Sequence, residues 1–169
     1  MKKVIVITTL IMSMLVMTAC GGKKVPDGWY EGSIEFYKEG FACNWSNEEP
    51  DYYIIDELKD PDTTFGYMLR DLDGDGAEEL LVGIIDDEPE TKFTDILIWH
   101  SDIGAFRILS GGDGYYIYLC DNNVIKMDKW YGSQTLTDYM EYNSANNSFT
   151  ILDPAPAVTP GKYELTPFN

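Results

Sequence analysis

From Phe65 onward, hydrophobic and polar residues alternate in short runs that are typical of β-strands. Eight runs rich in β-branched and aromatic residues cover residues 65–72, 79–85, 93–100, 105–110, 115–120, 123–131, 135–142 and 148–152. Turn-forming stretches such as Asp-Gly-Asp-Gly and Gly-Gly-Asp-Gly separate these runs. Because no helical pattern intervenes, we expect antiparallel hairpins that follow one another as a meander. The proline-rich residues 153–161 predict a crossing, and residues 162–168 predict an edge strand.

The pattern before Phe65 predicts one helix and a loop. Large apolar residues recur at spacings of three to five from Trp29 to Trp45, which indicates an amphipathic helix that Gly32 and Gly40 weaken. Residues 46–64 are acidic and contain two prolines, so we expect a loop with one helical turn. The expected fold is therefore mainly β, of the α+β class: an antiparallel β-meander of hairpins with one N-terminal helix, in a single domain over residues 29–169.

The first twenty residues have the organisation of a secretory signal. Two lysines precede an apolar run of 14 residues, from Val4 to Met17, which is shorter than the roughly 20 residues of a membrane-spanning helix. The sequence Met-Thr-Ala-Cys that ends at Cys20 resembles the lipobox of bacterial lipoproteins, with Met in place of the usual Leu. The resemblance implies a signal peptide at 1–19, a lipidated Cys20, and a tether at 20–28. The alternative is an ordinary secretory signal followed by a free cysteine.

Charge narrows the choice of partners. The chain carries a formal net charge of −17, and removal of the two lysines in residues 1–19 makes it −19. Such an excess of acid argues against binding to nucleic acid and against electrostatic docking on anionic lipid. We therefore expect a domain on the extracytoplasmic face of the cell membrane, held there by its N-terminal lipid alone.

Two further cysteines, Cys43 and Cys120, leave a choice open. An exported protein could pair them in a disulfide. Alternatively, both are buried thiols that behave as small apolar residues, and this interpretation is slightly favoured because spacing alone cannot place two Cα atoms within bonding range.

Residues 71–79 carry the most specific motif of the chain. With Asp71 as position 1, Asp73, Asp75 and Glu79 occupy positions 3, 5 and 9, and a glycine at position 6 permits a tight turn. Alternate carboxylates on such a loop supply the oxygen ligands that calcium prefers, and the backbone carbonyl of Ala77 is a natural further ligand. An EF-hand would need glutamate at position 12 and helical flanks, whereas here position 12 is valine and the flanks are strand-like.

The pattern D-x-D-x-D-G-x-x-E resembles the calcium loop of FG-GAP repeats, the blades of integrin-type propellers, in which the loop joins two strands. More widely, residues 67–83 and the strand Tyr-Tyr-Ile-Tyr-Leu-Cys at 115–120 are similar to small lipoproteins of clostridial-type bacteria. The resemblance covers roughly residues 29–153, although only the loop is specific. It implies a propeller-blade-like meander with one N-terminal helix and a structural calcium ion, and it implies no activity.

The alternative is an acidic turn without metal, since Asp-Gly is common turn chemistry. Four carboxylates about 8 Å apart repel by roughly 2 kcal/mol per pair at an effective dielectric of about 20. A turn needs only one or two such acids, so this repulsion favours a bound cation.

No recognisable catalytic motif accompanies the loop. His100 is the only histidine and lies near a strand end, where it could act as a general base, but no nucleophile–base motif includes it. A half-exposed structural histidine is the favoured interpretation. A small acidic hydrolase that uses His100 or a carboxylate pair remains the alternative to a non-catalytic module.

Aromatic residues supply the candidate ligand-binding surface. Trp99, Tyr116, Tyr118 and Trp130 lie on neighbouring expected strands, with Tyr115 and Tyr131 beside them. An exposed aromatic row would stack on sugars or hold a peptide, but the favoured interpretation is that a sheet packed under one helix needs these large rings in its core. We expect a non-catalytic binding module for a glycan, a peptide or a protein partner, because no nucleophile–base motif is present.

Overall fold

A computed structural model of the chain describes residues 28–45 and 54–168. The expected signal peptide at 1–19, the lipidation at Cys20 and most of the tether at 20–28 lie outside the described residues. Among the described residues, no helix combines the length and the apolar character needed to cross a membrane.

One helix and nine strands make up the described fold. The helix α1 spans Glu31–Ala42, and a 3-10 turn at Asp56–Lys59 leads into the first strand. The strands are β1 Thr64–Arg70, β2 Glu79–Ile85, β3 Lys92–His100, β4 Gly104–Ser110, β5 Tyr115–Leu119, β6 Ile125–Trp130, β7 Thr135–Asn143, β8 Ser148–Ile151 and β9 Thr166–Pro167. The expected helix, the helical turn and all eight strands are thus confirmed, with bounds that differ by three residues at most. The expected edge strand is confirmed as the short β9, which begins four residues later than predicted.

All nine strands belong to one antiparallel sheet with the order β8-β7-β6-β5-β3-β2-β1-β9. The sequence predicts consecutive hairpins, and the structure departs from this at one point. Strand β4 pairs with β3 over Asp95–His100, whereas β5 pairs with the start of β3, at Lys92 and Phe93, and not with β4. The glycine-rich turn between β4 and β5 permits this branch, because Gly112 and Gly114 adopt the left-handed conformation.

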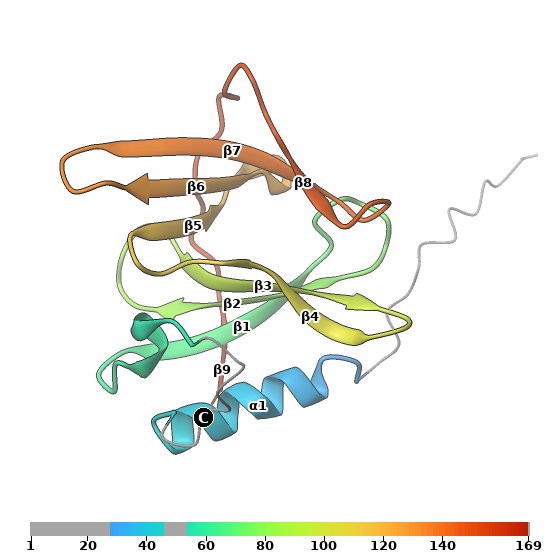
Figure 1. The fold of residues 1–169 in the computed structure, drawn as a ribbon, viewed down its shortest axis with the longest axis vertical. Coiled ribbons are helices and arrows are strands. Elements are labelled where there is room, and N and C mark those ends of the chain that lie inside the picture. The colour runs from blue at the N-terminus through green and yellow to red at the C-terminus, as the bar shows by residue number, and fades with distance from the viewer. Residues whose placement is uncertain (1–27, 46–53, 169) are drawn as a thin grey trace, which may run out of the picture.

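The sheet has a hydrophobic cluster on each of its faces. Along β2, Leu80 and Val82 face α1 while Leu81 faces the opposite way, as the two-residue period of a strand requires. The helix-side cluster also contains Tyr37 and Trp45, and the other cluster, on the opposite face, is formed by residues of β2, β3, β5, β6 and β7 with Leu72 and Leu165. Figure 1 shows α1 below β1–β3 and the strands β6 and β7 above them.

A buried charge lies where α1 meets the sheet. Asp95 of β3 is fully buried and accepts hydrogen bonds from Arg107 at 3.2 Å and from Ser110 at 3.0 Å, and Tyr37 of α1 donates to it as well. Burial raises the pKa of Asp95, against the opposing effect of the Arg107 guanidinium. This network fixes the helix over β3 and β4.

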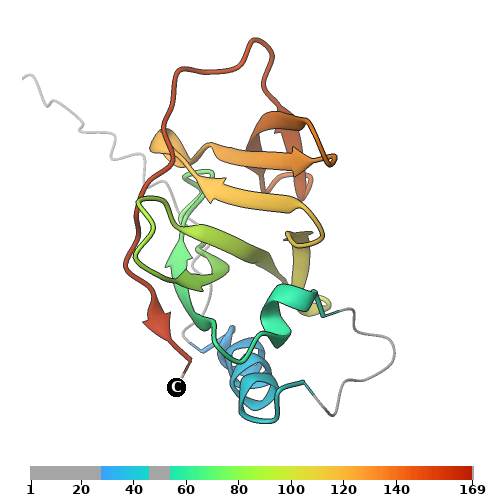
Figure 2. The ribbon, with the colours of Figure 1, turned by 90° about the vertical axis from the view of Figure 1, so that its left-hand side faces the viewer.

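The residues after β8 cross the molecule along one side and end as β9 beside β1, as Figures 1 and 2 show. On the way, Gly161 accepts a hydrogen bond from the backbone N–H of Thr91 and donates one to the carbonyl of Leu119. The proline-rich crossing that the sequence predicts is therefore attached to the residue before β3 and to the end of β5. Cys120, buried nearby, and Cys43 are both free thiols, and burial raises the pKa of Cys120 to about 11.

Candidate metal site and the adjoining cleft

The loop between β1 and β2 is organised by its own aspartates. Both oxygens of Asp71 accept backbone N–H bonds, from Gly74 at 2.7 Å and from Gly76 at 2.9 Å. Asp73 accepts from the N–H of Asp75, and Asp75 accepts from the N–H of Ala77, each two residues further on. Gly74 and Gly76 have positive φ angles, which a residue without a Cβ adopts at little cost.

This folding gathers three of the four predicted acidic ligands. Carboxylate oxygens of Asp71, Asp73 and Asp75 all lie within 4.8 Å of one another. Two full charges at that separation repel by about 3.5 kcal/mol at an effective dielectric of about 20. Each carboxylate has roughly four acceptor positions and uses only some of them on protein donors, so the cluster keeps free oxygen positions of the kind that hard cations prefer. The donor set fits calcium and does not fit the softer metals.

A distant turn completes the loop. Ser144, in the turn between β7 and β8, donates its backbone N–H to Asp73 at 2.7 Å and its hydroxyl to Asp75 at 2.8 Å. Burial acts to raise the pKa of Asp73, but the hydrogen bonds from Ser144 and from the N–H of Asp75 outweigh it and leave this pKa below its usual value. The sequence analysis missed Ser144, because nothing near it in the chain marks a contact with a loop some 70 residues away.

A second distant residue supports the start of the loop. The side-chain amide of Asn123 donates to the carbonyl oxygen of Asp71 at 2.8 Å, and its side-chain oxygen accepts from Arg70 at 2.9 Å. Asn123 has a positive φ angle, which its turn between β5 and β6 requires. The sequence analysis did not single out this residue either.

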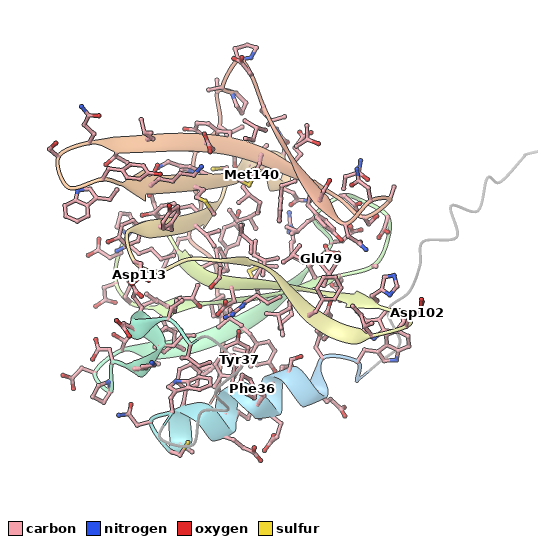
Figure 3. All side chains as sticks on the ribbon, viewed as in Figure 1. Phe36, Tyr37, Glu79, Asp102, Asp113 and Met140 are labelled. Atoms are coloured by element: carbon pink, nitrogen blue, oxygen red, sulfur yellow. The ribbon has the colours of Figure 1, made fainter. Side chains whose placement is uncertain are left out.

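Glu79, the fourth predicted acidic ligand, is placed differently from the aspartates. It is only 4% exposed, and its Oε2 accepts the backbone N–H of Leu72 at 2.9 Å, so it links the two ends of the loop. Figure 3 labels Glu79 among the side chains of the domain. Burial, helped by the negative charges of the three aspartates, raises the pKa of Glu79 to about 8. The three-oxygen cluster does not include it. Ala77, the predicted carbonyl ligand, is half-buried and lies between the cluster and Glu79 in the sequence.

A cleft of about 350 Å³ adjoins the loop. Three segments line it: the loop with Asp75, Ala77 and Glu79, the end of β3 with Trp99 and His100, and the β7–β8 hairpin with Tyr142, Ser144 and Asn147. One cleft is thus lined by four predicted site residues, three from the metal loop and Trp99 from the aromatic set. His100, the only histidine of the chain, lines it too. Burial and the charge of Glu79 raise the pKa of Tyr142, which agrees with their proximity.

His100 has a modest set of contacts within this cleft. Its Nδ1 accepts the backbone N–H of Asp102 at 3.2 Å. The neighbouring Ser101 hydroxyl donates to Asp102 and not to the imidazole. In the described part of the chain, no serine or cysteine side chain is hydrogen-bonded to His100 in the manner of an activated nucleophile.

The four aromatic residues of the predicted ligand-binding set do not form one row. Tyr116, Tyr118 and Trp130 share the outer face of β5 and β6, since Tyr116 pairs with Asp128 and Tyr118 with Lys126. Tyr118 is only 8% exposed, under the ammonium of Lys126, whereas Trp130 is 55% exposed. Trp99 lies instead on the helix side of the sheet, where its ring contacts Trp29.

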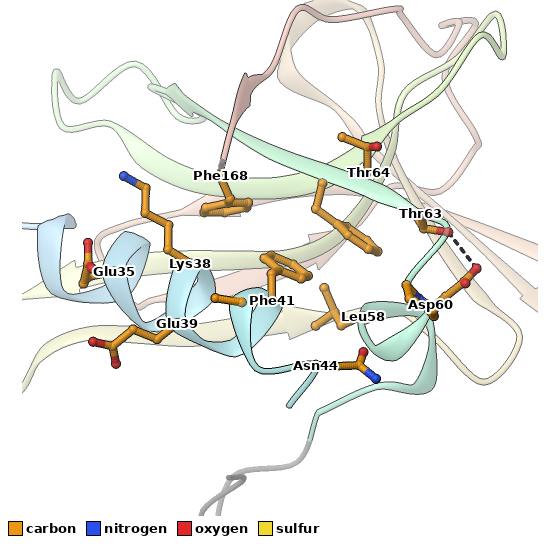
Figure 4. Close-up of a pocket in the computed structure, with 13 residues that line it drawn as sticks. Glu35, Lys38, Glu39, Phe41, Asn44, Leu58, Asp60, Thr63, Thr64 and Phe168 are labelled. Carbon is orange, nitrogen blue, oxygen red and sulfur yellow. Dashed lines mark hydrogen bonds between the residues drawn. The ribbon is translucent and has the colours of Figure 1, made fainter. Parts of the chain in front are cut away.

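A larger hollow of about 560 Å³ lies between α1 and β1, away from the acidic loop (Figure 4). Phe41, Phe65 and Phe168 form its apolar floor, and the Phe41 and Phe65 rings are stacked. The Thr63 hydroxyl on its rim donates to Asp60 at 2.8 Å. None of the residues that the sequence marks as site candidates lines this hollow, so the candidate site remains the loop and its cleft. Compared with known protein families, curated proteins and solved structures, the chain matches none.

Proposed function

We propose that this chain is a lipid-anchored surface domain whose loop at 71–79 binds one structural calcium ion, and that it is a non-catalytic binding module for a glycan, a peptide or a protein partner. The observation that supports this most is the cluster of Asp71, Asp73 and Asp75, with oxygens within 4.8 Å of one another. Backbone N–H groups hold each carboxylate in place, so the ligands are positioned before an ion arrives.

The ion would act on two parts of the sheet together. The loop joins β1 to β2, and Ser144 attaches the same loop to the turn between β7 and β8. Neutralising the repulsion among the three aspartates therefore supports the first and the last hairpins at once. The proposal follows the FG-GAP-like pattern of the sequence, in which the loop connects strands and takes no part in chemistry.

A small hydrolase is the second candidate, because His100 lines the same cleft as the carboxylates of Asp75 and Glu79. An imidazole beside a carboxyl group with a pKa of about 8 offers an acid and a base in one place. We favour the binding module, since His100 has no bonded nucleophile in the described part of the chain. A hydrolytic activity that the wild type has and His100→Gln lacks would favour the hydrolase instead.

The calcium proposal predicts the behaviour of Asp73→Asn. Extracellular calcium sites commonly bind with dissociation constants of about 10⁻⁴ to 10⁻³ M, so millimolar calcium should stabilise the wild type by roughly 0.4 to 1.4 kcal/mol. The Asp73→Asn variant should lose most of this gain, because one charged ligand is removed. Thermal unfolding of both proteins, with calcium and with chelator, measures the gain, and calorimetric titration measures calcium binding directly.

Asp87→Asn is the matched control, because Asp87 is exposed in the turn at the opposite end of β2. It removes the same charge and should keep the full response to calcium. The quantity compared is the calcium-dependent change in the unfolding midpoint of each protein. Absolute midpoints are not compared, because Asp73 also accepts hydrogen bonds that stabilise the loop without metal. If calcium stabilises wild type and Asp73→Asn equally, or neither, the loop is an acidic turn and the proposal is wrong.

A further inference from the structure

Strand β4 is an open edge of the sheet. In the described part of the chain it pairs with β3 alone, because β5 pairs with the start of β3 instead. The pairing of Gly104–Arg107 with Leu97–His100 is regular, and the register then shifts at Ile108. In an antiparallel strand, alternate residues direct their N–H and C=O groups away from the partner strand. Within Gly104–Arg107, such groups therefore face a side on which the described residues place no strand.

Few of the usual devices protect this edge. Natural edge strands are kept short, bulged, or supplied with lysine or proline, because unpaired backbone groups accept a strand from another chain. Strand β4 has seven residues with neither lysine nor proline, and only its bulge is a device of this kind. Its one charged residue, Arg107, is paired with the buried Asp95 at 3.2 Å. The edge strands β8 and β9 have only four and two residues, so β4 is the edge best suited to strand addition.

A hollow of about 280 Å³ lies between this strand and α1. Leu97, Ala105 and Arg107 line it from one face of the sheet, because Leu97 pairs with Arg107 and Ala105 lies two residues earlier on β4. This is the face that α1 covers, and Gly32 and Phe36 of α1 line the hollow from the other side. Among the described residues, none of β1 or β2 lines it, so the hollow lies at the edge of the sheet.

The hollow suits one apolar side chain of a larger ligand. Its volume is below the range for small-molecule pockets, which is roughly 300 to 1,000 Å³. Phe36 is 37% exposed beside it, Leu97 and Tyr37 are buried beneath it, and the charge of Arg107 is matched by Asp95. In a strand added to β4, every second side chain would point to the face that α1 covers, and one of them would enter the hollow.

The charges around β4 indicate a basic ligand. Asp102 lies in the turn before β4 and Asp113 in the turn after it, and both are exposed. Figure 3 labels these two residues at opposite ends of the strand. The chain as a whole has a formal net charge of −17. This charge attracts a basic segment and repels a second copy of the chain, which would bring the same −17 to the edge.

We infer that the open edge of β4 binds an extended peptide segment of a partner protein as a further strand. The segment carries one large apolar side chain, which enters the hollow between α1 and β4, and lysine or arginine on both sides of it. Backbone pairing holds the segment, and the hollow selects the side chain. This inference deepens the proposed binding function and rests on it, since it chooses a peptide among the ligand classes and gives the place where it binds.

A set of capped nonapeptides tests the inference. Their sequence is Lys-Lys-Thr-Thr-X-Thr-Thr-Lys-Lys, where X is leucine, isoleucine, methionine, phenylalanine or tyrosine. In nuclear magnetic resonance titrations, at least one should bind the full-length protein in a saturable way and slow hydrogen exchange at alternate amides of Gly104–Arg107. Peptides with serine at X, or with glutamate in place of every lysine, should bind about tenfold more weakly or worse.

Several results would overturn the inference. It is wrong if no peptide binds, or if binding depends neither on X nor on the charge of the peptide. It is also wrong if the slowed exchange appears at β8 or at β9 instead of β4. Protection of the β4 amides that rises with protein concentration, without any peptide, would assign the edge to a second copy of the chain and would likewise overturn it.

A blocking variant and a control on the same helix locate the peptide. A Cβ added at Gly32 would contact nothing within 4 Å outside the helix itself, so Gly32→Phe places a ring at the hollow without displacing the sheet. It should weaken binding of the tightest peptide by about tenfold or more. Ala42→Phe adds the same ring at the exposed end of α1, beside the larger hollow, and should leave binding unchanged. Unchanged binding in Gly32→Phe, or a loss in Ala42→Phe alone, would overturn the inference.

Calcium titration of the same samples distinguishes the two proposals. Calcium binding without peptide binding contradicts only this inference, because the loop at 71–79 and the edge of β4 are separate sites. Absence of both contradicts the calcium proposal as well.

Discussion

At the scale of single residues, four acids of one short loop occupy two different environments. Asp71, Asp73 and Asp75 lie at or near the surface and accept two hydrogen bonds each. Glu79 lies beneath them, 4% exposed, with one bond to the N–H of Leu72. The difference matters for titration, because burial and the anionic neighbours raise the pKa of Glu79.

Glu79 therefore predicts a pH dependence of stability. Its pKa is about 8 in the folded protein and 4.5 as the ordinary value, so the folded state binds the proton more tightly than the unfolded state. The stability that this provides is complete below about pH 4.5 and is lost as the pH rises through about 8. In chelator, the wild type should lose on the order of 4 kcal/mol relative to Glu79→Gln between pH 5 and pH 9.

Urea unfolding of the two proteins across this pH range measures the difference. Glutamine has the volume of a protonated glutamate, keeps an oxygen for the Leu72 N–H and does not titrate, and Asp95 contributes equally to both proteins. Parallel curves for wild type and Glu79→Gln would show that Glu79 is ionised in the folded state throughout.

The residue types and spacing of the loop were enough to predict the aspartate cluster, because alternate residues on a tight turn converge on one side. They could not separate Glu79 from the aspartates, since the burial of Glu79 depends on the segments that cover β2. The burial of Tyr118 could not be predicted from alternation either. It shares the outer face of β5 with Tyr116, but it lies under Lys126 and is only 8% exposed.

At the scale of elements, the turn between β7 and β8 acts as a support for the acidic loop. The Ser144 hydroxyl donates to Asp75, and this is a hydrogen bond to a charged acceptor. Ser144→Ala should lower the free energy of unfolding by about 1 to 2 kcal/mol. The backbone N–H bond from residue 144 to Asp73 remains in this variant, so the fold should be weakened and not lost.

Ser148→Ala is the control within the same hairpin, because the Ser148 hydroxyl donates to Asn146 and its bond stays inside the exposed turn. We expect the free energy of unfolding of this variant to change by less than about 0.5 kcal/mol. Chemical denaturation of the three proteins gives both differences. Equal effects of the two substitutions would mean that the turn is not coupled to the loop.

The elements themselves were largely predictable, whereas one connection between them was not. Two-residue alternation places Leu80 and Leu81 on opposite faces of β2, and such local patterns predicted every strand. The pairing of β5 with Phe93 of β3 is a contact between distant residues. It depends on how the Gly-Gly-Asp-Gly turn redirects the chain, and hydrophobic alternation along the sequence carries no information on that choice.

At the scale of the whole molecule, the negative charge and the length of the segment before the domain bear on the proposed attachment to a membrane. A net charge of −17, or −19 after removal of residues 1–19, repels an anionic lipid surface. Nine residues, from Cys20 to Gly28, span at most about 30 Å when fully extended. A lipid at Cys20 would therefore hold the domain close to a surface that its own charge does not favour, and the attachment would depend on the acyl chains.

This dependence leads to the last prediction, that Cys20 is the lipidated N-terminus of the mature chain. Two acyl chains contribute about 0.8 kcal/mol per buried methylene, enough for stable anchoring where a single chain is marginal. The wild type should therefore sediment with membranes and resist extraction by high salt, because no ionic attraction holds it. Mass spectrometry of the membrane fraction should show a chain that begins at Cys20 and carries the lipid mass, and Cys20→Ser should lack that mass. A soluble, secreted chain with an unmodified Cys20 would contradict the prediction.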